Sequence, residues 1–274
     1  QKRALKQAFG EVRVSNAIAV RAGLLKLPMS LYELLPIAAY EFGSSSPVDS
    51  LIQDLGVGGR DIGAVVDIAP LHKKRYLHVE LGAYNGDANG ASNKPGLGLV
   101  GGRITSRPIS RLRLGFDCLY RPRAASDVND TGTVYEKYST GATCSADAEF
   151  SYHKFGIRGE FLNGKRTDSP IFTDKSKHTF MAAWGIATYR IKLRGKSALI
   201  PAVRVEWLDE DRQSNVGGSL LMSAAMNIDF TRNVRLLFDL SRHNVQVGTR
   251  ARSAILPIYK PSATSGVIQL QLKL

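Results

Sequence analysis

Apolar and polar residues alternate with a period of two along most of the chain. In residues 110–120, Phe116 and Tyr120 share one face of an extended segment, and Arg111 and Arg113 share the other. A period of two is typical of β-strands whose two faces meet different surroundings. The pattern therefore predicts an all-β protein. The same alternation recurs at residues 197–209, 233–243 and 265–274.

The alternation predicts thirteen strands, joined by connections of two different lengths. The strands span about residues 4–13, 17–26, 59–70, 73–86, 97–107, 110–121, 138–152, 154–165, 178–191, 197–209, 218–231, 233–246 and 265–274. Short turns lie near residues 15–16, 72, 108–109, 153, 195 and 232, and longer loops span 27–58, 87–96, 122–137, 166–177, 210–217 and 247–264. Short turns at one end and long loops at the other are typical of transmembrane barrels.

We therefore expect a transmembrane antiparallel up-and-down β-barrel of about 12–16 strands, with short periplasmic turns and longer extracellular loops. Bacterial barrels have an even number of strands, whereas thirteen is odd. The number becomes twelve if segments 4–13 and 17–26 form a single long strand. Most of the predicted strands reach ten residues, which is near the length that crosses a bilayer at a tilt of about 45°.

A soluble β-sandwich is the alternative, since it also alternates, but its strands usually span about five or six residues. Aromatic residues near the strand ends favour the membrane barrel, because they suit an interfacial girdle. These residues are Tyr76, Tyr84, Tyr120, Tyr138, Tyr152, Tyr189 and Trp207. Helical spacing occurs only at residues 30–36, inside the loop 27–58.

Composition narrows the class further. The chain has 274 residues, 43% of them hydrophobic, and a formal net charge of +13 from 37 Lys+Arg and 24 Asp+Glu. This apolar content is too high for a disordered chain, and no apolar run reaches the roughly 18–20 residues of a membrane-spanning helix. No charged and apolar leader opens the chain, so a leader was either removed or never present. We expect one domain over residues 1–274, with loop 27–58 folded into the lumen.

If the apolar face meets lipid, the polar face encloses a lumen. The basic residues predicted to line it are Arg103, Arg111, Arg113, Lys154, Arg158, Arg204 and Arg235. Acidic residues are nearly as numerous on the same face, and Glu206 lies only two residues from Arg204. Two interpretations stay open, namely a network of ion pairs and a wall that attracts anions.

Much of the surplus positive charge lies at the end with short turns. This basic rim consists of Lys73, Lys74, Arg75, Arg107, Lys192, Arg194, Lys196 and Arg232. In a barrel it is periplasmic, where it would contact the phosphates of outer-membrane lipid, concentrate small anionic solutes, or bind an acidic protein partner. Nucleic acid is not an expected partner, because the bases form no basic helix and no aromatic stacking surface.

Three segments resemble one known family. Residues 20–34 contain a Val-Arg-Ala-Gly strand followed by Lys-Leu-Pro and a short helical loop. Residues 55–67 contain an Arg-Asp-Ile-Gly strand, and residues 78–86 end in Asn-Gly. Together they resemble the signature of the phosphate-selective porin O/P-like family. The resemblance implies an outer-membrane barrel of a Gram-negative bacterium that passes anions, commonly as a homotrimer.

Loop 27–58 departs from that family's lysine-rich constriction loop. It contains Glu33, Glu41, Asp49 and Asp54, and hardly any basic residue after Lys26.

Cys118 and Cys144 are predicted to face each other. A hairpin centred near Thr131 pairs residues whose numbers sum to 262, and 118 + 144 = 262. A disulfide in the oxidising envelope and two free, lipid-buried thiols are both compatible with this register.

Motifs for other chemistry are weak. Residues 96–101 match GxGxxG by letter, but the sequence that follows predicts a strand where a phosphate site needs a helix. The histidines show no metal-ligand spacing, and nothing marks an oxyanion site. We therefore expect no metal, no cofactor and no enzyme.

Two functions follow. The first is a passive porin-like channel for small, preferentially anionic solutes. The alternative is a non-conducting structural barrel that anchors a multiprotein envelope complex, such as secretion or motility machinery, with its lumen closed by loop 27–58 and internal ion pairs.

Overall fold

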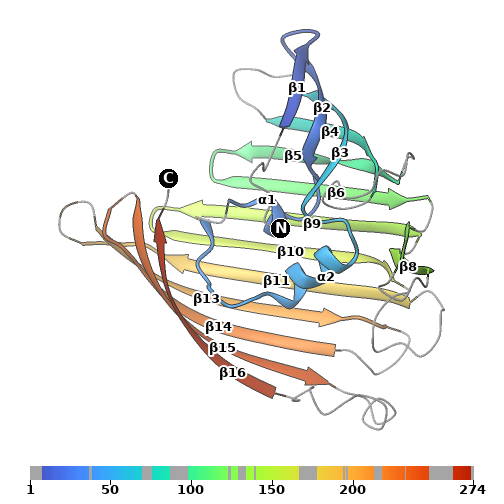
Figure 1. Ribbon diagram of the computed structural model, residues 1–274. Coiled ribbons are helices and arrows are strands. Elements are labelled where there is room, and N and C mark those ends of the chain that lie inside the picture. The colour runs from blue at the N-terminus through green and yellow to red at the C-terminus, as the bar shows by residue number, and fades with distance from the viewer. Residues whose placement is uncertain are drawn as a thin grey trace.

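A computed structural model describes residues 8–36, 39–69, 76–86, 98–122, 125–128, 134–138, 140–166, 178–193, 195, 197–212, 218–231, 233–246 and 262–272. Most of these residues belong to one 14-stranded sheet that curves around a concave inner face (Figure 1). Each strand on the main path runs antiparallel to the next, so the all-β, up-and-down fold is confirmed.

The main path follows chain order. It consists of β1 (Ala8–Arg13), β2 (Ile18–Lys26), β3 (Arg60–Ile68), β4 (Leu77–Tyr84), β5 (Leu99–Ile109), β6 (Leu112–Arg121), β9 (Gly141–Tyr152), β10 (Phe155–Arg166), β11 (His178–Tyr189), β13 (Ala198–Asp209), β14 (Gly218–Asp229), β15 (Val234–Gln246) and β16 (Ser262–Leu272). The short β12 (Ile191–Lys192) pairs with β13, and β7 (Ala125–Val128) and β8 (Val134–Tyr138) form a separate hairpin.

All thirteen predicted strands are present on this path, with ends that shift by a few residues. Segments 4–13 and 17–26 are two antiparallel strands rather than one, because Glu11 and Arg21 pair across a tight turn. Residues 4–7, 70, 73–75, 97, 139 and 273–274 of the predicted strands lie outside the described part of the chain. Within that part β1 and β16 are the two edges of the sheet, which is therefore open.

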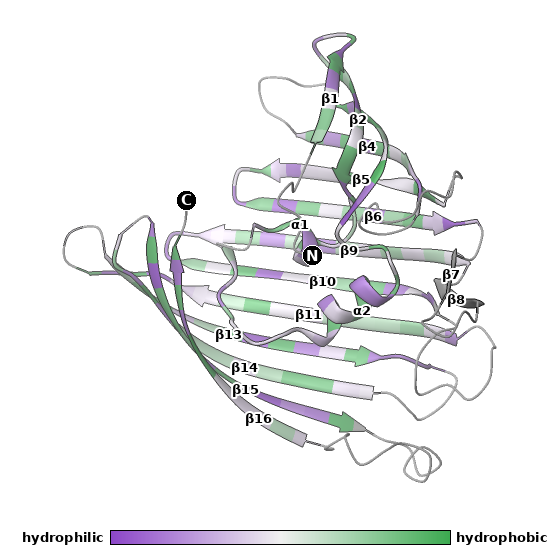
Figure 2. Cartoon of the chain, viewed as in Figure 1, coloured by the Kyte–Doolittle hydropathy of each residue, from purple (hydrophilic) through white to green (hydrophobic). Residues whose placement is uncertain are grey.

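The apolar positions of the strands face outward. On β13, Val203 and Val205 are 55% and 51% exposed, whereas Arg204 and Glu206 between and beside them are each 1% exposed. Figure 2 shows the same alternation of hydrophobic and hydrophilic residues along other strands. A soluble sandwich buries its apolar faces against each other. Here the apolar face is the exposed one, which matches a surface that contacts hydrocarbon.

The segment 27–58, hereafter the inward segment, lies with its described residues 27–36 and 39–58 against the concave face of the sheet (Figure 1). It contains α1 (Leu31–Leu34), at the predicted helical spacing, and α2 (Pro47–Asp54), which the prediction missed. Its buried residues form one hydrophobic core with inward apolar residues of the sheet; Leu27, Met29, Val48, Leu51 and Ile52 come from the segment, and Leu119, Leu162, Phe180, Ala182 and Trp184 from the strands.

Two further features complete the fold. Cys118 of β6 and Cys144 of β9 lie opposite each other in register, and a disulfide joins them on the outward face. None of the helices in the described ranges has the length and apolar character needed to cross a membrane.

Candidate functional site at the inner face

The inward segment is attached to the sheet at three places, the first of which is Ser30. The Ser30 hydroxyl donates to the Glu160 carboxylate at 2.7 Å, and the Leu31 amide donates to the same carboxylate at 3.0 Å. Trp184 donates to it from the sheet at 2.8 Å. Ser30 has a φ of 61°, an unusual backbone conformation for a residue other than glycine. Buried Glu160 thus holds the beginning of α1.

Arg103 lies beside this first attachment. Its guanidinium forms ion pairs with Asp117 and Asp147, and all three side chains are buried. Ser145 donates a further hydrogen bond to Asp117 at 2.7 Å. The carboxylates of Asp117, Asp147 and Glu160 lie within 4.8 Å of one another, a spacing that would suit a cation. Arg103 already supplies positive charge there, so this cluster is part of the wall.

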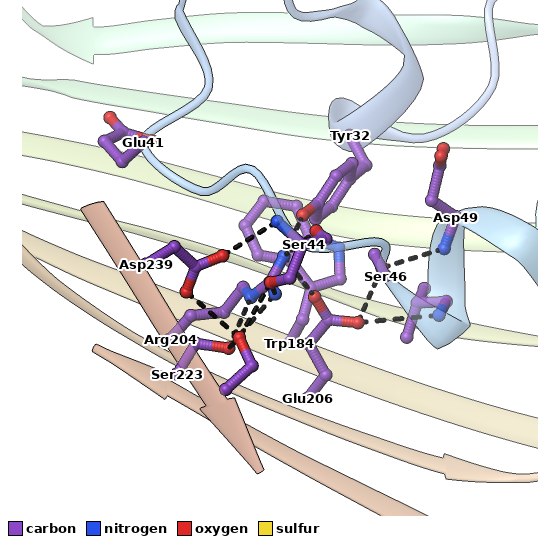
Figure 3. Close-up of polar contacts among 12 residues, drawn as sticks. Tyr32, Glu41, Ser44, Ser46, Asp49, Trp184, Arg204, Glu206, Ser223 and Asp239 are labelled. Atoms are coloured by element: carbon purple, nitrogen blue, oxygen red, sulfur yellow. Dashed lines mark hydrogen bonds and ion pairs between the residues drawn. The ribbon is translucent and has the colours of Figure 1, made fainter. Parts of the chain in front are cut away.

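The second attachment is centred on Arg204 of β13 (Figure 3). Its guanidinium donates to the Tyr32 hydroxyl at 2.8 Å and to the Ser44 hydroxyl at 2.6 Å, both in the inward segment. It also donates to Ser223 of β14 at 3.1 Å and stands over the ring of Phe42, 4.5 Å from its centroid. One buried cation therefore joins two strands to three residues of the segment.

Acidic side chains of the sheet hold the backbone near Arg204. The Ser44 amide donates to Asp239 at 2.7 Å, and the Ser46 hydroxyl donates to Glu206 at 2.6 Å. Ser46 also accepts a hydrogen bond from the Asp49 amide at 3.0 Å, so it caps the N-terminus of α2. Figure 3 shows Ser44 and Ser46 between the strands and α2.

The third attachment lies around Glu41. Its carboxylate forms an ion pair with Arg158 of β10, and its carbonyl accepts a hydrogen bond from Asn227 of β14 at 3.1 Å. Arg235 of β15 donates to the Tyr40 carbonyl at 3.2 Å and pairs with Asp229 at 2.7 Å. In this third attachment, β10, β14 and β15 therefore bind the inward segment directly.

Burial changes the proton affinities of groups in the segment. It raises the pKa of Asp49 to about 7, and the nearby Glu33 carboxylate adds to the rise. Burial also raises the pKa of Glu41, which Arg158 and Arg235 oppose, and it raises the pKa of Tyr32 to about 12. The segment therefore carries an acidic group that changes charge near neutral pH.

The predicted lumen residues separate into two groups. On the inner face, Arg103, Arg113, Arg158, Arg204 and Arg235 each form an ion pair with a carboxylate. Arg111 and Lys154 are exposed at the turns that precede β6 and β10, one residue before each strand begins. They therefore lie outside the strands that carry the five paired arginines.

Two residues of the predicted basic rim, Arg107 and Lys192, are described, and both are exposed. The others, Lys73, Lys74, Arg75, Arg194, Lys196 and Arg232, lie outside the described residues.

Sequence reasoning missed two sets of residues. Tyr32, Ser44 and Ser46 attach the inward segment, and the Ser-Pro pair at 46–47, followed by Asp49, was a readable signal for the start of α2. At the long-loop end of β11, His178 Nδ1 lies 3.1 Å from Asp211 Oδ1, and both residues are buried. The two residues are 33 positions apart in the sequence, so no local motif indicated that they would meet.

Comparison with known proteins gives the fold. No protein-family model matches the chain, and no curated protein matches it. Among solved structures, a loop L8 deletion mutant of OmpT, an outer membrane protein of Vibrio cholerae, matches with a TM-score of 0.58 at 11% identity, over 94% of this chain and 76% of that chain.

Two in-vitro folded forms of the same Vibrio cholerae protein also match. The trimer form has a TM-score of 0.54 at 11% identity, over 88% of this chain and 71% of that chain. The other has a TM-score of 0.52 at 10% identity, over 96% of this chain and 87% of that chain. This chain therefore has the fold of an outer-membrane β-barrel. The fold and its apolar outer face confirm the predicted location in the outer membrane.

The prediction of a passive anion channel is corrected by these findings. The matching structures are barrels of OmpT, an outer membrane protein, and at 10–11% identity they share the fold with this chain without supporting a channel. The inner-face arginines that were predicted to attract anions are paired with carboxylates. The inward segment also covers part of the face that a passive channel would keep open.

The exclusion of an enzyme is corrected as well. It depended on the absence of catalytic motifs from the sequence, and the structural similarity to OmpT barrels is the finding that overturns it. The His178–Asp211 pair also shows that long-range arrangements of titratable residues escape a motif search. At 10–11% identity these neighbours assign no activity to this chain.

Proposed function

We propose that this chain forms a non-conducting outer-membrane barrel in which the inward segment is a plug, and that the barrel anchors a protein assembly of the envelope. The observation that carries the plug is the attachment of the segment to β10, β13, β14 and β15 through buried polar contacts, and the anchor is the function that a plugged barrel leaves.

The chemistry of these contacts supports a fixed plug. Arg204 and Glu206 are each 1% exposed, and breaking a buried ion pair by removing one partner costs about 3–5 kcal/mol. To leave the wall, the segment would have to expose its apolar core and leave several buried charges without partners. This cost opposes movement of the segment away from the sheet, so the segment suits a permanent plug better than a gate that opens and closes.

The proposal also includes a distant relation to the phosphate-selective porin O/P-like family. Residues 20–34, 55–67 and 78–86 carry the resemblance; the first two overlap the ends of the inward segment, and the third follows it in the chain. Glu33, Glu41 and Asp49 give the segment an acidic character that suits phosphate passage poorly, and Glu41 uses its carboxylate to pair with Arg158.

A deletion tests the plug. The Leu27 amide donates to the Gly59 carbonyl at 3.0 Å, so residues 28–58 can be replaced by a two-residue Asn-Gly turn. In planar bilayers the natural protein should give no steady conductance, and the deletion variant should conduct. Circular dichroism checks that both proteins are folded. Equal steady conductance of the two proteins would disprove the plug.

Purification from native membranes in mild detergent tests the anchor. Native mass spectrometry should find the chain in a complex of fixed stoichiometry with another protein, without chemical cross-linking. A homotrimer alone, or a monomer alone, would contradict the anchor but leave the plug standing.

A further inference from the structure

The outward face of β9, β10, β11 and β13 contains a groove. Gly159 lies opposite both Ala148 and Gly185, so a row of small residues crosses β9, β10 and β11, and it ends at Val205 of β13, which lies opposite Gly185. Larger side chains line the rows on either side; they are Phe150, Ile157 and Val203 toward the short turns, and Phe161 and Trp207 toward the long loops. The result is an apolar groove of about 520 Å³.

The groove contains free space at Gly185. A Cβ atom added there would meet no heavy atom closer than 4.0 Å. At neighbouring Gly159, an added Cβ would come within 2.7 Å of the Trp184 carbonyl, so that glycine is needed for backbone packing. Backbone packing does not require a glycine at position 185. The missing side chain there makes the groove deeper.

Aromatic and basic residues lie at the short-turn end of the same four strands. Tyr152, Phe155 and Tyr189 are 42–46% exposed in the next outward row. Beyond them, Lys154 and Lys192 are exposed and, within the described part of the chain, form no ion pair. Arg111 lies 4.6 Å from the centroid of the Tyr152 ring. The groove is therefore followed by an aromatic row and then by positive charge.

We propose that this surface binds one anionic phospholipid of the periplasmic leaflet. An acyl chain fills the groove at Gly185, the tyrosines lie at the level of the ester groups, and Lys154 and Lys192 bind the phosphate. The order of apolar, aromatic and basic groups matches the order of the chemical groups in such a lipid. The inference concerns the outer face and does not depend on the plug or the anchor.

Trp207 provides a probe for the test. The chain has two tryptophans, of which Trp207 faces outward and is 39% exposed, whereas Trp184 faces inward and is 4% exposed. The protein is reconstituted into phosphatidylcholine vesicles with brominated phosphatidylglycerol or brominated phosphatidylcholine, and quenching of Trp207 gives the relative binding of the two. We expect phosphatidylglycerol to bind about fivefold or more tightly, because each lysine near the surface favours an anionic lipid.

Two variants separate this site from ordinary lipid contact. Lys154→Gln with Lys192→Gln should bring the ratio close to one, whereas Lys165→Gln at the long-loop end of β10 should leave it unchanged. Gly185→Leu should reduce the binding of both brominated lipids beside Trp207. Its control, Ala224→Leu on the exposed face of β14, should not.

Equal quenching by the two brominated lipids in the natural protein would overturn the proposal. A ratio that survives the double lysine substitution would also overturn it. A third contrary result is that Gly185→Leu converts an oligomer into a monomer while the lipid ratio stays near one, since the groove would then be occupied by a second copy of the chain.

Discussion

Arg204 is the residue on which the attachment of the inward segment depends most. A guanidinium has five N–H donors, and this one uses them on Tyr32, Ser44 and Ser223 while it pairs with Glu206 at 3.3 Å. A lysine has a single charged centre and cannot reproduce this set of contacts.

Replacing Arg204 by alanine should therefore release the segment. The substitution leaves Glu206 buried without its cation, and we expect a loss of about 3–5 kcal/mol in the free energy of unfolding. Urea unfolding in detergent micelles measures the loss, and limited proteolysis reports whether cleavage begins in residues 27–58. The control is Arg13→Ala, which removes an exposed ion pair with Glu11 and should cost at most about 1 kcal/mol. Equal losses in the two variants would contradict the role of Arg204.

Asp49 should make the attachment of α2 depend on pH. Its pKa rises from 3.8 to about 7 when the segment is in place, so the attached state holds the proton more tightly than the unfolded state. The contribution of Asp49 to stability is therefore fully present below about pH 4 and is lost as the pH rises through about 7.

Asp49→Asn removes this dependence. The variant should show slower amide hydrogen exchange in α2 than the natural protein at pH 8, after correction for the intrinsic exchange rate, and the difference should vanish near pH 4. A difference of the same size at both pH values would show that the carboxyl group acts through packing and not through its charge.

The strands could be predicted from sequence because their signal is local. The alternation at positions such as Val203, Arg204 and Val205 indicates which face of the strand meets hydrocarbon. This can be inferred from adjacent residues alone, without knowledge of distant contacts. The start of α2 also had a local signal, the capping residue Ser46. The helix was nevertheless not predicted, because the sequence analysis searched for helical spacing of apolar residues and found it only at residues 30–36.

The attachments of the inward segment could not be predicted in the same way. Ser30 and Glu160 are 130 residues apart, and Ser44 and Asp239 are 195 residues apart. Sequence showed that acids and bases share the inner face. It did not show which of them meet each other and which meet the segment, because that depends on the curvature of the sheet.

The disulfide between β6 and β9 should be detectable directly. Intact-mass measurement without reductant should give a mass lower by two hydrogens than measurement after reduction. The bond closes a sequence separation of 26 residues, for which chain entropy alone predicts a stabilisation of about 3–4 kcal/mol. The variant with both Cys118→Ala and Cys144→Ala should unfold at a correspondingly lower urea concentration. Identical masses before and after reduction would exclude the bond.

The whole molecule has an exposed surface that only a membrane or detergent can cover. Outward residues such as Phe116, Leu240 and Ile268 are 52%, 61% and 73% exposed, and they lie on β6 and on the distant neighbouring pair β15 and β16. Exposed apolar area of this extent makes a protein in water aggregate. The surface and the fold therefore support the same location.

A charge on this surface should be costly. Phe116 lies in the middle of β6, and Phe116→Arg should lower the free energy of unfolding from lipid vesicles by about 2–4 kcal/mol, as an arginine near the bilayer midplane does. Phe116→Leu is the control and should change it much less. If the arginine variant remained as stable as the leucine variant, this part of β6 would not face hydrocarbon.

The position of the inward segment in the chain also determines when it reaches its place during folding. The segment leaves the sheet between β2 and β3, yet its partners Glu160, Arg204 and Asp239 belong to strands made much later. Neighbouring strands can zip together one after another, but these distant contacts must wait until the sheet is nearly complete. Assembly therefore passes through an intermediate in which the charged inner face of the sheet is formed but the inward segment is not yet bound to it. A chaperone or a binder that recognises this intermediate would act on the protein before the last folding step.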